Sequence, residues 1–306
     1  MNMPNSNVGA KGKKASPFPY SLYMYFIQLR PRQWTKNLLV FAALIFSIKK
    51  SNMDMLFHSI AGFFLFCFVS SCVYILNDFV DREADRQHPE KRHRPMASGA
   101  INPYGALLLG GVLLVFSLTM ALTFSPLFSL LLLVYFLLNI GYSLKLKHVV
   151  IVDVLIVASG FVLRAIGGGL VIGVALTPWF LICTMLLSIF LAISKRRHEV
   201  NALKTGKGAH RKVLDFYSIE LLNQLNSIVT TATIMSYALF TFTSGHTIHL
   251  MWTLVFVLYG VFRYLYLIHM ENKGGKPEKV LFEDRHILVT VMLYAFSVAL
   301  ILIYLE

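Results

Sequence analysis

Long apolar runs restrict the folds that this chain can adopt. The chain has 306 residues, of which 57% are hydrophobic and 14% are charged, and its mean hydropathy is +0.65. The hydrophobic fraction exceeds that of a typical water-soluble domain, and the apolar residues occur in long blocks. Since a helix needs roughly 20 apolar residues to cross a bilayer, the pattern predicts an all-α, polytopic membrane bundle.

The blocks predict about nine transmembrane helices in a single domain. The predicted spans are 37–50, 56–78, 104–123, 126–143, 151–173, 177–194, 226–244, 247–269 and 287–305. The first span is too short for a full crossing, so we expect it to begin before Pro31 and to kink there. Residues 1–19 form a predicted disordered basic head, and residues 20–306 form the membrane domain.

The distribution of Lys and Arg predicts how the chain is oriented. Loops on one side carry nearly all the basic residues, whereas the loops on the other side carry only Lys49 and Lys50. By the positive-inside rule, the N-terminus and the basic loops face the cytoplasm and the C-terminus faces out, in a cytoplasmic membrane. The net charge of +13 is therefore mostly a topology signal, and it does not indicate nucleic-acid binding.

An acidic run directly follows the second apolar block. Asp78, Asp81 and Asp85 fall within about 60° of one another on a continuous helix, with Asn77 beside them. Like charges at the edge of a low-dielectric region need a neutralising cation, and oxygen ligands suit Mg²⁺ bridged to a phosphate. We therefore predict a magnesium site at Asn77, Asp78, Asp81 and Asp85, with the three aspartates catalytic.

Basic residues near the same membrane face predict a multiply phosphorylated substrate. Arg forks and Lys point charges are needed where Mg²⁺ neutralises only part of a substrate's charge. For each single residue, the alternative role is simply to anchor the topology. The candidate substrate-binding residues at this face are Lys36, Lys91, Arg92, Arg94, Tyr142, Lys145, Lys195 and Arg196.

Two further charges lie inside the predicted span 151–173. Asp153 and Arg164 differ by about 20° around the helix and by about 16 Å in depth. A charge at membrane depth is costly, so its default interpretation is functional, and we add both residues to the substrate-binding set. The alternatives are a structural ion pair or a contact between the arginine and backbone carbonyl groups.

Taken together, these motifs resemble a known family. The Asn-Asp-x-x-Asp-x-x-x-Asp run, the Lys-Arg-x-Arg-Pro-Met-Ala-Ser-Gly loop and the nine spans resemble the UbiA superfamily of intramembrane prenyltransferases. Residues 30–37, 153–164 and 194–196 resemble its decaprenyl-phosphate phosphoribosyltransferase branch. This resemblance implies Mg²⁺-dependent transfer of 5-phosphoribose from phosphoribosyl pyrophosphate (PRPP) to a polyprenyl phosphate, with release of pyrophosphate.

One departure from the broader superfamily fits that branch. Ordinary members carry a second acidic motif before the fifth span, whereas residues 145–153 hold one carboxylate and two lysines here. Two alternatives stay open. One is transfer of a prenyl group from a prenyl diphosphate to an aromatic or glycerol-phosphate acceptor, and the other is transport of an anionic lipid or metabolite. The expected partners are PRPP, a polyprenyl phosphate and membrane lipids, and a homo-oligomer is compatible with the sequence.

Overall fold

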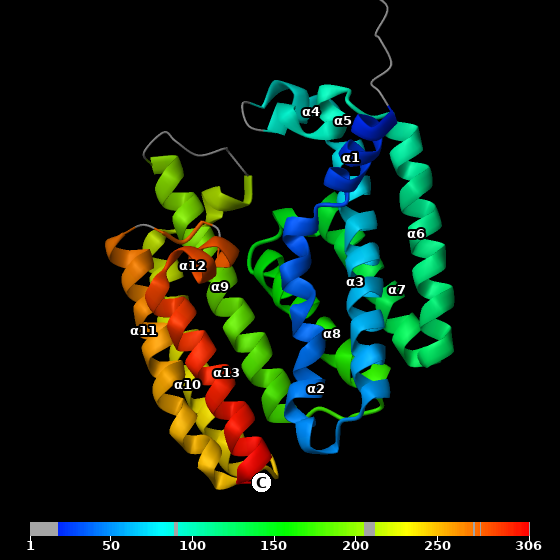
Figure 1. Ribbon diagram of the computed structural model, residues 1–306. Coiled ribbons are helices and arrows are strands. Elements are labelled where there is room, and N and C mark those ends of the chain that lie inside the picture. The colour runs from blue at the N-terminus through cyan, green and yellow to red at the C-terminus, as the bar shows by residue number, and fades with distance from the viewer. Residues whose placement is uncertain (1–17, 89–90, 205–211, 272, 276, 306) are drawn as a thin grey trace, which may run out of the picture.

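A computed structural model describes residues 18–88, 91–204, 212–271, 273–275 and 277–305. Nearly all of the predicted basic head at 1–19 lies outside the described residues. The described residues form helices joined by loops, without a strand, which confirms the predicted all-α membrane bundle (Figure 1).

Eight helical segments are long and apolar enough to cross a membrane, as judged over the described part of the chain. Each one overlaps a predicted span, from the second to the ninth. They are α3 (Met53–Val80), α6 (Pro103–Phe124), α7 (Pro126–Leu144), α8 (Val152–Ile172), α9 (Pro178–Lys204), α10 (Ile219–Thr243), η6 (Ile248–Thr253) continued by α11 (Leu254–Met270), and α13 (Arg285–Tyr304).

The first predicted span, 37–50, is not a regular helix, so eight long helices replace the nine predicted. After α1 (Phe18–Gln28), the chain forms a 3₁₀ helix, η1 (Pro31–Phe41), then α2 (Ala42–Phe46) and η2 (Ile48–Lys50). A 3₁₀ helix rises about 2 Å per residue, so this broken segment covers more depth than an α-helix of equal length. It runs beside α3 for most of the height of the bundle (Figure 1). The break comes before Pro31, as the sequence predicted.

Local sequence signals explain where several long helices begin. Asn102 accepts a hydrogen bond from the backbone of Tyr104, and Ser125 accepts one from Leu127. Each of these capping residues is followed by a proline at the first helical position, where the missing N–H is not needed.

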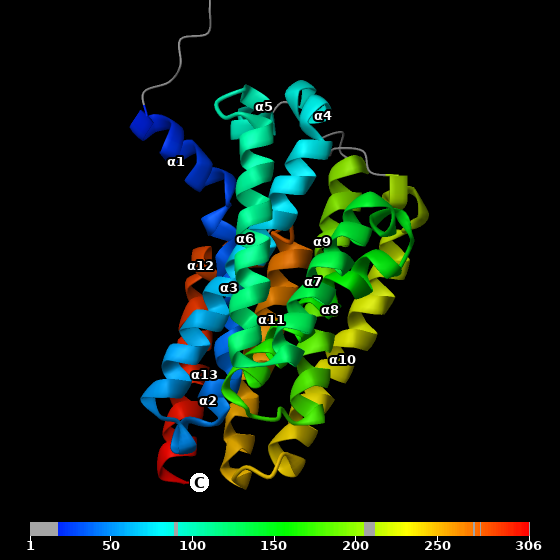
Figure 2. The same cartoon turned by 90° about the vertical axis from the view of Figure 1, so that its right-hand side faces the viewer.

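Short elements collect at one end of the bundle. There α4 (Arg82–Gln87), η3 (Lys91–His93) and α5 (Pro95–Ser98) follow α3 as a small helical cap. The C-terminus lies at the opposite end (Figures 1 and 2). The remaining short elements are η4 (Leu146–His148), η5 (Lys212–Phe216) and α12 (Pro277–Glu283).

Glycines on α8 allow the broken first segment to pack closely. A Cβ atom on Gly168 would lie 2.1 Å from the carbonyl oxygen of Val40, and one on Gly167 would lie 2.5 Å from the ring of Phe66. Backbone cannot move aside as a flexible side chain can, so Gly168 fixes the approach of η1 to α8.

We therefore expect Gly168→Ala to lower the free energy of unfolding by about 1–3 kcal/mol through overpacking. Gly111→Ala is the matched control, because a Cβ atom there meets nothing within 4 Å and removing a helical glycine should stabilise α6 by about 0.5–1 kcal/mol. Thermal unfolding in detergent, followed by intrinsic fluorescence, measures both changes. Equal midpoints for the two variants would contradict the assigned contact.

Candidate active site

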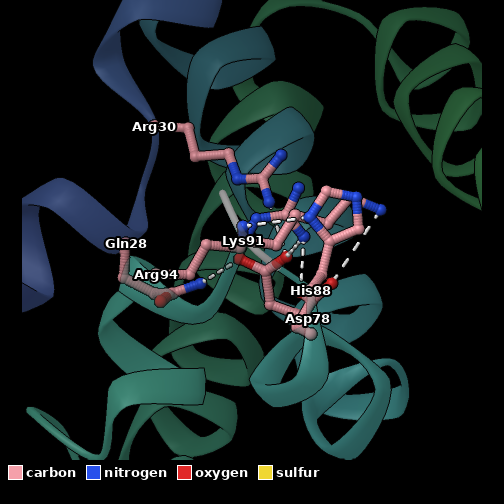
Figure 3. A network of polar contacts seen from close by, with 7 residues as sticks. Gln28, Arg30, Asp78, His88, Lys91 and Arg94 are labelled. Atoms are coloured by element: carbon pink, nitrogen blue, oxygen red, sulfur yellow. Dashed lines mark hydrogen bonds and ion pairs between the residues drawn. The ribbon is translucent and has the colours of Figure 1, made fainter. Parts of the chain in front are cut away.

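A buried carboxylate, Asp78, lies near the end of α3 and is only 3% exposed. It accepts hydrogen bonds from Gln28 Nε2 at 2.8 Å, Arg30 Nη2 at 2.5 Å and Arg94 Nη1 at 3.0 Å. Figure 3 shows these three side chains converging on Asp78 from the N-terminal segment and from the loop that follows α4. Two arginines thus pair with a carboxylate whose burial alone would be costly.

A second buried carboxylate, Asp85 on α4, shares one of these arginines. Arg94 Nη1 donates to Asp85 Oδ2 at 2.6 Å while it also contacts Asp78, and Lys91 Nζ lies 3.9 Å from Asp85 Oδ1. The two predicted carboxylates therefore meet around a single cationic nitrogen. Lys91 and Arg94 are brought to them, as the sequence predicted.

Asp81 does not join the other two aspartates in a common group. The prediction placed all three on one face of a continuous helix, but α3 ends at Val80 and α4 begins at Arg82. Asp81 lies between the two helices as a capping residue with φ −85° and ψ 3°. The rotation of 100° per residue therefore does not continue through it, and the three aspartates do not share one helix face. Its side chain forms no hydrogen bond or ion pair with the described residues. Its role as a metal ligand stays a prediction, as does that of Asn77.

The acidic residues nevertheless have a donor set that fits a divalent cation. Among the described residues, no three His, Cys, Asp or Glu side chains are grouped to hold a metal ion. Carboxylate oxygens of Asp78 and Asp85 do, however, flank the same positive nitrogen of Arg94. A cation position between two carboxylates is what Mg²⁺ uses when its other ligands are water and substrate phosphate.

Gln28 and Arg30 contribute to this site and were not among the predicted site residues. Arg30 has φ 55° and ψ 58°, in the left-handed region that non-glycine residues seldom adopt. This conformation turns the chain between α1 and η1, and it brings the guanidinium to Asp78 and over the ring of Tyr74. Arg30 lies in the stretch 30–37 that carries part of the family resemblance, but the Arg-Pro step marks a turn without giving its direction.

A separate buried ion pair joins α8 to α9. Asp153, fully buried, lies 2.9 Å from Arg196 Nε and accepts a hydrogen bond from the Tyr217 hydroxyl at 2.8 Å. Burial raises the pKa of Tyr217 to about 12, so its phenol stays protonated and donates. Arg196 also pairs with Glu199. Because Asp153 and Arg196 are enclosed, this geometry favours the structural ion pair that the sequence left as an alternative.

Lys195, next to Arg196 on α9, is an exposed residue whose ammonium group is nevertheless desolvated by its neighbours. It interacts electrostatically with Glu199, Lys36 and Tyr142. Three predicted substrate-binding residues, from η1, α7 and α9, therefore lie near one another. The two lysines among them form a second cationic group.

Arg164 lies in the interior of the bundle. Its Nε donates to Asn37 Oδ1 at 2.7 Å, its Nη2 to the Tyr135 hydroxyl at 2.6 Å, and its Nη1 to the carbonyl oxygen of Gly160 at 2.7 Å. These neutral partners link η1, α7 and α8. The geometry favours the carbonyl-contact alternative over direct substrate binding.

Arg92 and Lys145 are exposed at the surface. The Arg92 guanidinium contacts only the neighbouring ring of His93, and the Lys145 side chain forms no hydrogen bond or ion pair, as judged over the described part of the chain. Their predicted role in substrate binding stays a prediction.

Comparison with known proteins places this site in a family context. A model of the UbiA prenyltransferase family matches residues 38–283. The match covers most of the chain and contains both carboxylates that contact Arg94.

Curated relatives are similar over most of their length. The decaprenyl-phosphate phosphoribosyltransferase of Corynebacterium glutamicum is 33% identical over 309 residues, covering 97% of this chain and 92% of that protein. The enzyme of the same name from Mycolicibacterium smegmatis is 32% identical over 271 residues, covering 84% of this chain and 85% of that protein.

Solved structures share the fold. A UbiA homologue from Archaeoglobus fulgidus, bound to DMAPP and Mg²⁺, matches with a TM-score of 0.69 and 20% identity, covering 90% of this chain and 99% of that one. At this identity, the likeness supports the fold alone.

The buried pair makes a prediction about stability. Asp153→Asn should lower the free energy of unfolding by about 3–5 kcal/mol, because it removes one partner of an enclosed ion pair. Tyr217→Phe removes only a neutral donor and should cost about 1 kcal/mol. Thermal unfolding in detergent tests this order, and Asp153→Asn protein as stable as the unmodified chain would refute it.

Proposed function

The chain belongs to the UbiA prenyltransferase family, and we propose that it transfers 5-phosphoribose from PRPP to a polyprenyl phosphate. It is a multi-pass membrane transferase whose relatives, at 32% and 33% identity over most of their length, are decaprenyl-phosphate phosphoribosyltransferases. The specific donor and acceptor are the part of this function that we propose.

The observation that carries the proposal is the surplus of cations around the carboxylates. Arg30, Lys91 and Arg94 surround two buried aspartates, and Lys36 and Lys195 form a second positive group. A donor with only a diphosphate needs one such group. PRPP carries a 5-phosphate as well as a pyrophosphate, so two cationic groups suit its two anionic ends.

The proposed reaction is a single displacement at C1 of the ribose. An oxygen of the lipid phosphate forms a bond to C1 as the bond from C1 to the pyrophosphate oxygen breaks, with inversion. The lipid phosphate is already anionic at neutral pH, so the site needs no strong general base. The roles left to the protein are to hold phosphates, align the two reactants and neutralise charge on the leaving group.

In this proposal the carboxylates hold the cofactor and the arginines hold substrate. Mg²⁺ bound by Asp78 and Asp85, with Asp81 and Asn77, would supply charge neutralisation at the pyrophosphate. Arg94 and Arg30 can then donate to phosphate oxygens, since each guanidinium offers more N–H groups than one carboxylate uses.

We place the reaction at the cytoplasmic membrane face. The acidic site lies at the end of the bundle that carries α4 and α5 (Figure 1). The basic loops that predict a cytoplasmic location belong to the same side by topology. PRPP is a soluble anion, whereas a polyprenyl tail requires lipid, so a site at a membrane surface suits both.

The first test uses purified protein, Mg²⁺, radiolabelled PRPP and a polyprenyl phosphate, with label scored in the organic phase. We expect transfer by the unmodified chain, loss with EDTA, and a decrease of about 10²- to 10³-fold for Asp81→Asn. Glu83→Gln is the matched control. Glu83 is an exposed carboxylate on the same segment, its hydrogen bonds with Arg82 and Arg86 lower its pKa, and it is not among the predicted metal ligands.

The prenyltransferase alternative remains the main competitor, because a structure of the same fold is bound to DMAPP and Mg²⁺. Absence of label from PRPP, together with transfer from a labelled prenyl diphosphate to an aromatic or glycerol-phosphate acceptor, would replace the proposed function with that one. Uptake of PRPP into vesicles without product would instead support the transporter alternative.

Neighbouring residues on α9 give a second prediction. Lys195→Gln should raise KM for PRPP by about tenfold to a hundredfold and should change the unfolding midpoint less than Arg196→Gln does, since Arg196 is the buried partner of Asp153. Arg196→Gln should lower the midpoint, because it leaves Asp153 buried without its cation. Steady-state kinetics measure KM for both variants, and thermal unfolding measures their midpoints. An unchanged KM in Lys195→Gln would remove this lysine from the substrate site.

A further inference from the structure

A polar stripe on α10 faces a cavity outside the candidate active site. The cavity has a volume of about 330 Å³ and lies between α10 and α11, which run side by side in Figure 1. Five α10 residues line it with spacings of three and four, so they occupy one helix face: Asn223, Asn226, Ser227, Thr230 and Thr231. The stripe extends about 12 Å along the helix axis.

Two polar side chains in this stripe are buried and lack partners. Asn226 is 1% exposed, and neither its amide nitrogen nor its oxygen has a hydrogen-bond partner in the described structure. The hydroxyl of Thr230, which is 7% exposed, also has none. Burying a polar group without a hydrogen bond is unfavourable, so these side chains are available to bind a ligand in the cavity.

A cation without a carboxylate partner stands at the end of the stripe. Arg197 of α9 donates from Nε to Asn223 Oδ1 at 2.7 Å and from Nη1 to the carbonyl oxygen of Ile268 at 3.2 Å. Its Nη2 lies 3.0 Å from His269 Nδ1. Among the described residues, no partner of Arg197 is acidic. Since arginine can only donate, neutral His269 carries its proton on Nε2 and keeps a donor free.

The order of these groups along the bundle matches the polarity of a membrane interface. Asn223 and His269 lie within about one helical turn of the helix ends, whereas Thr230 lies about 16 Å along α10 from its first residue. Ser227, Thr231 and His269 are exposed on the outer surface of the bundle, and the polar groups are followed by the apolar side chain of Leu265. The cavity is therefore reachable from the surrounding lipid.

We infer that this cavity binds an anionic glycerophospholipid. Its phosphate lies at Arg197 and His269, and its ester carbonyls accept hydrogen bonds from Asn226 and Thr230. Such a lipid presents its phosphate at the membrane interface and its glycerol esters a few ångströms deeper. The protein places a cation at the interface and neutral hydrogen-bond donors deeper, in the same order.

The test uses the full chain in nanodiscs and counts retained lipid by native mass spectrometry. We expect phosphatidylglycerol to be retained in preference to phosphatidylcholine. Arg197→Gln and Thr230→Val should each weaken retention by at least about tenfold, the loss of one charged or one buried hydrogen bond. Asn226→Leu, which replaces the buried amide with an apolar side chain of similar size, should weaken it at least as strongly.

Matched controls separate the site from general effects of charge or polarity. Lys279→Gln removes an exposed positive charge that does not line the cavity, and Thr119→Val removes a membrane threonine whose hydroxyl bonds only its own helix. Both should retain lipid as the unmodified chain does. Because the readout is lipid retention, the result is independent of the phosphoribosyl assay.

Three outcomes would overturn the inference. Retention could be equal in the cavity variants and the controls. Inorganic phosphate alone could give the same thermal stabilisation as phosphatidylglycerol micelles. Finally, Asn226→Leu and Thr230→Val could change the oligomeric mass without changing retained lipid, which would identify the polar stripe as a contact between helices of two copies.

Discussion

The requirement that a buried charge be neutralised organises both halves of this molecule. Asp78 is enclosed at the end of α3, and its partners come from segments 48 and 16 residues away along the chain. Asp153 is enclosed at the start of α8, and its cation comes from α9. In each case, satisfying one carboxylate fixes the relative position of two or three helical segments. The ion pairs thus determine where the exposed cations, such as Lys195, can stand.

The sequence was most informative where one physical signal dominates. Hydropathy located the eight long helices, since crossing a bilayer requires a long run of predominantly apolar residues. The acidic run and the basic loop after it were correctly expected to meet, because α4 and α5 leave only a short path between Asp85 and Arg94. The kink before Pro31 could be read from the residue itself.

Other features could not be read from the chain. The break at Asp81 depends on how α4 packs, and no residue near it is a strong helix breaker. The recruitment of Gln28 and Arg30 depends on a left-handed backbone at Arg30, which tertiary contacts impose against local preference. The position of Asp153 and Arg164 inside a membrane span marked them as candidate functional residues. Only the partners seen in the structure distinguish a structural role from a contact with substrate.

The broken first segment has a consequence for how the chain is made. The amide nitrogen of Asn37, in η1, donates to Cys67 and Ser70 of α3, whereas its amide oxygen accepts from Arg164, 127 residues later in the chain. The same segment packs against the glycine face of α8. During synthesis, η1 and its first partner, α3, therefore emerge well before α8 does. The first segment can pack beside α3 early, but its contacts with Arg164 and Gly168 can form only after α8 has been synthesised. The segment thus acquires its contacts in two stages.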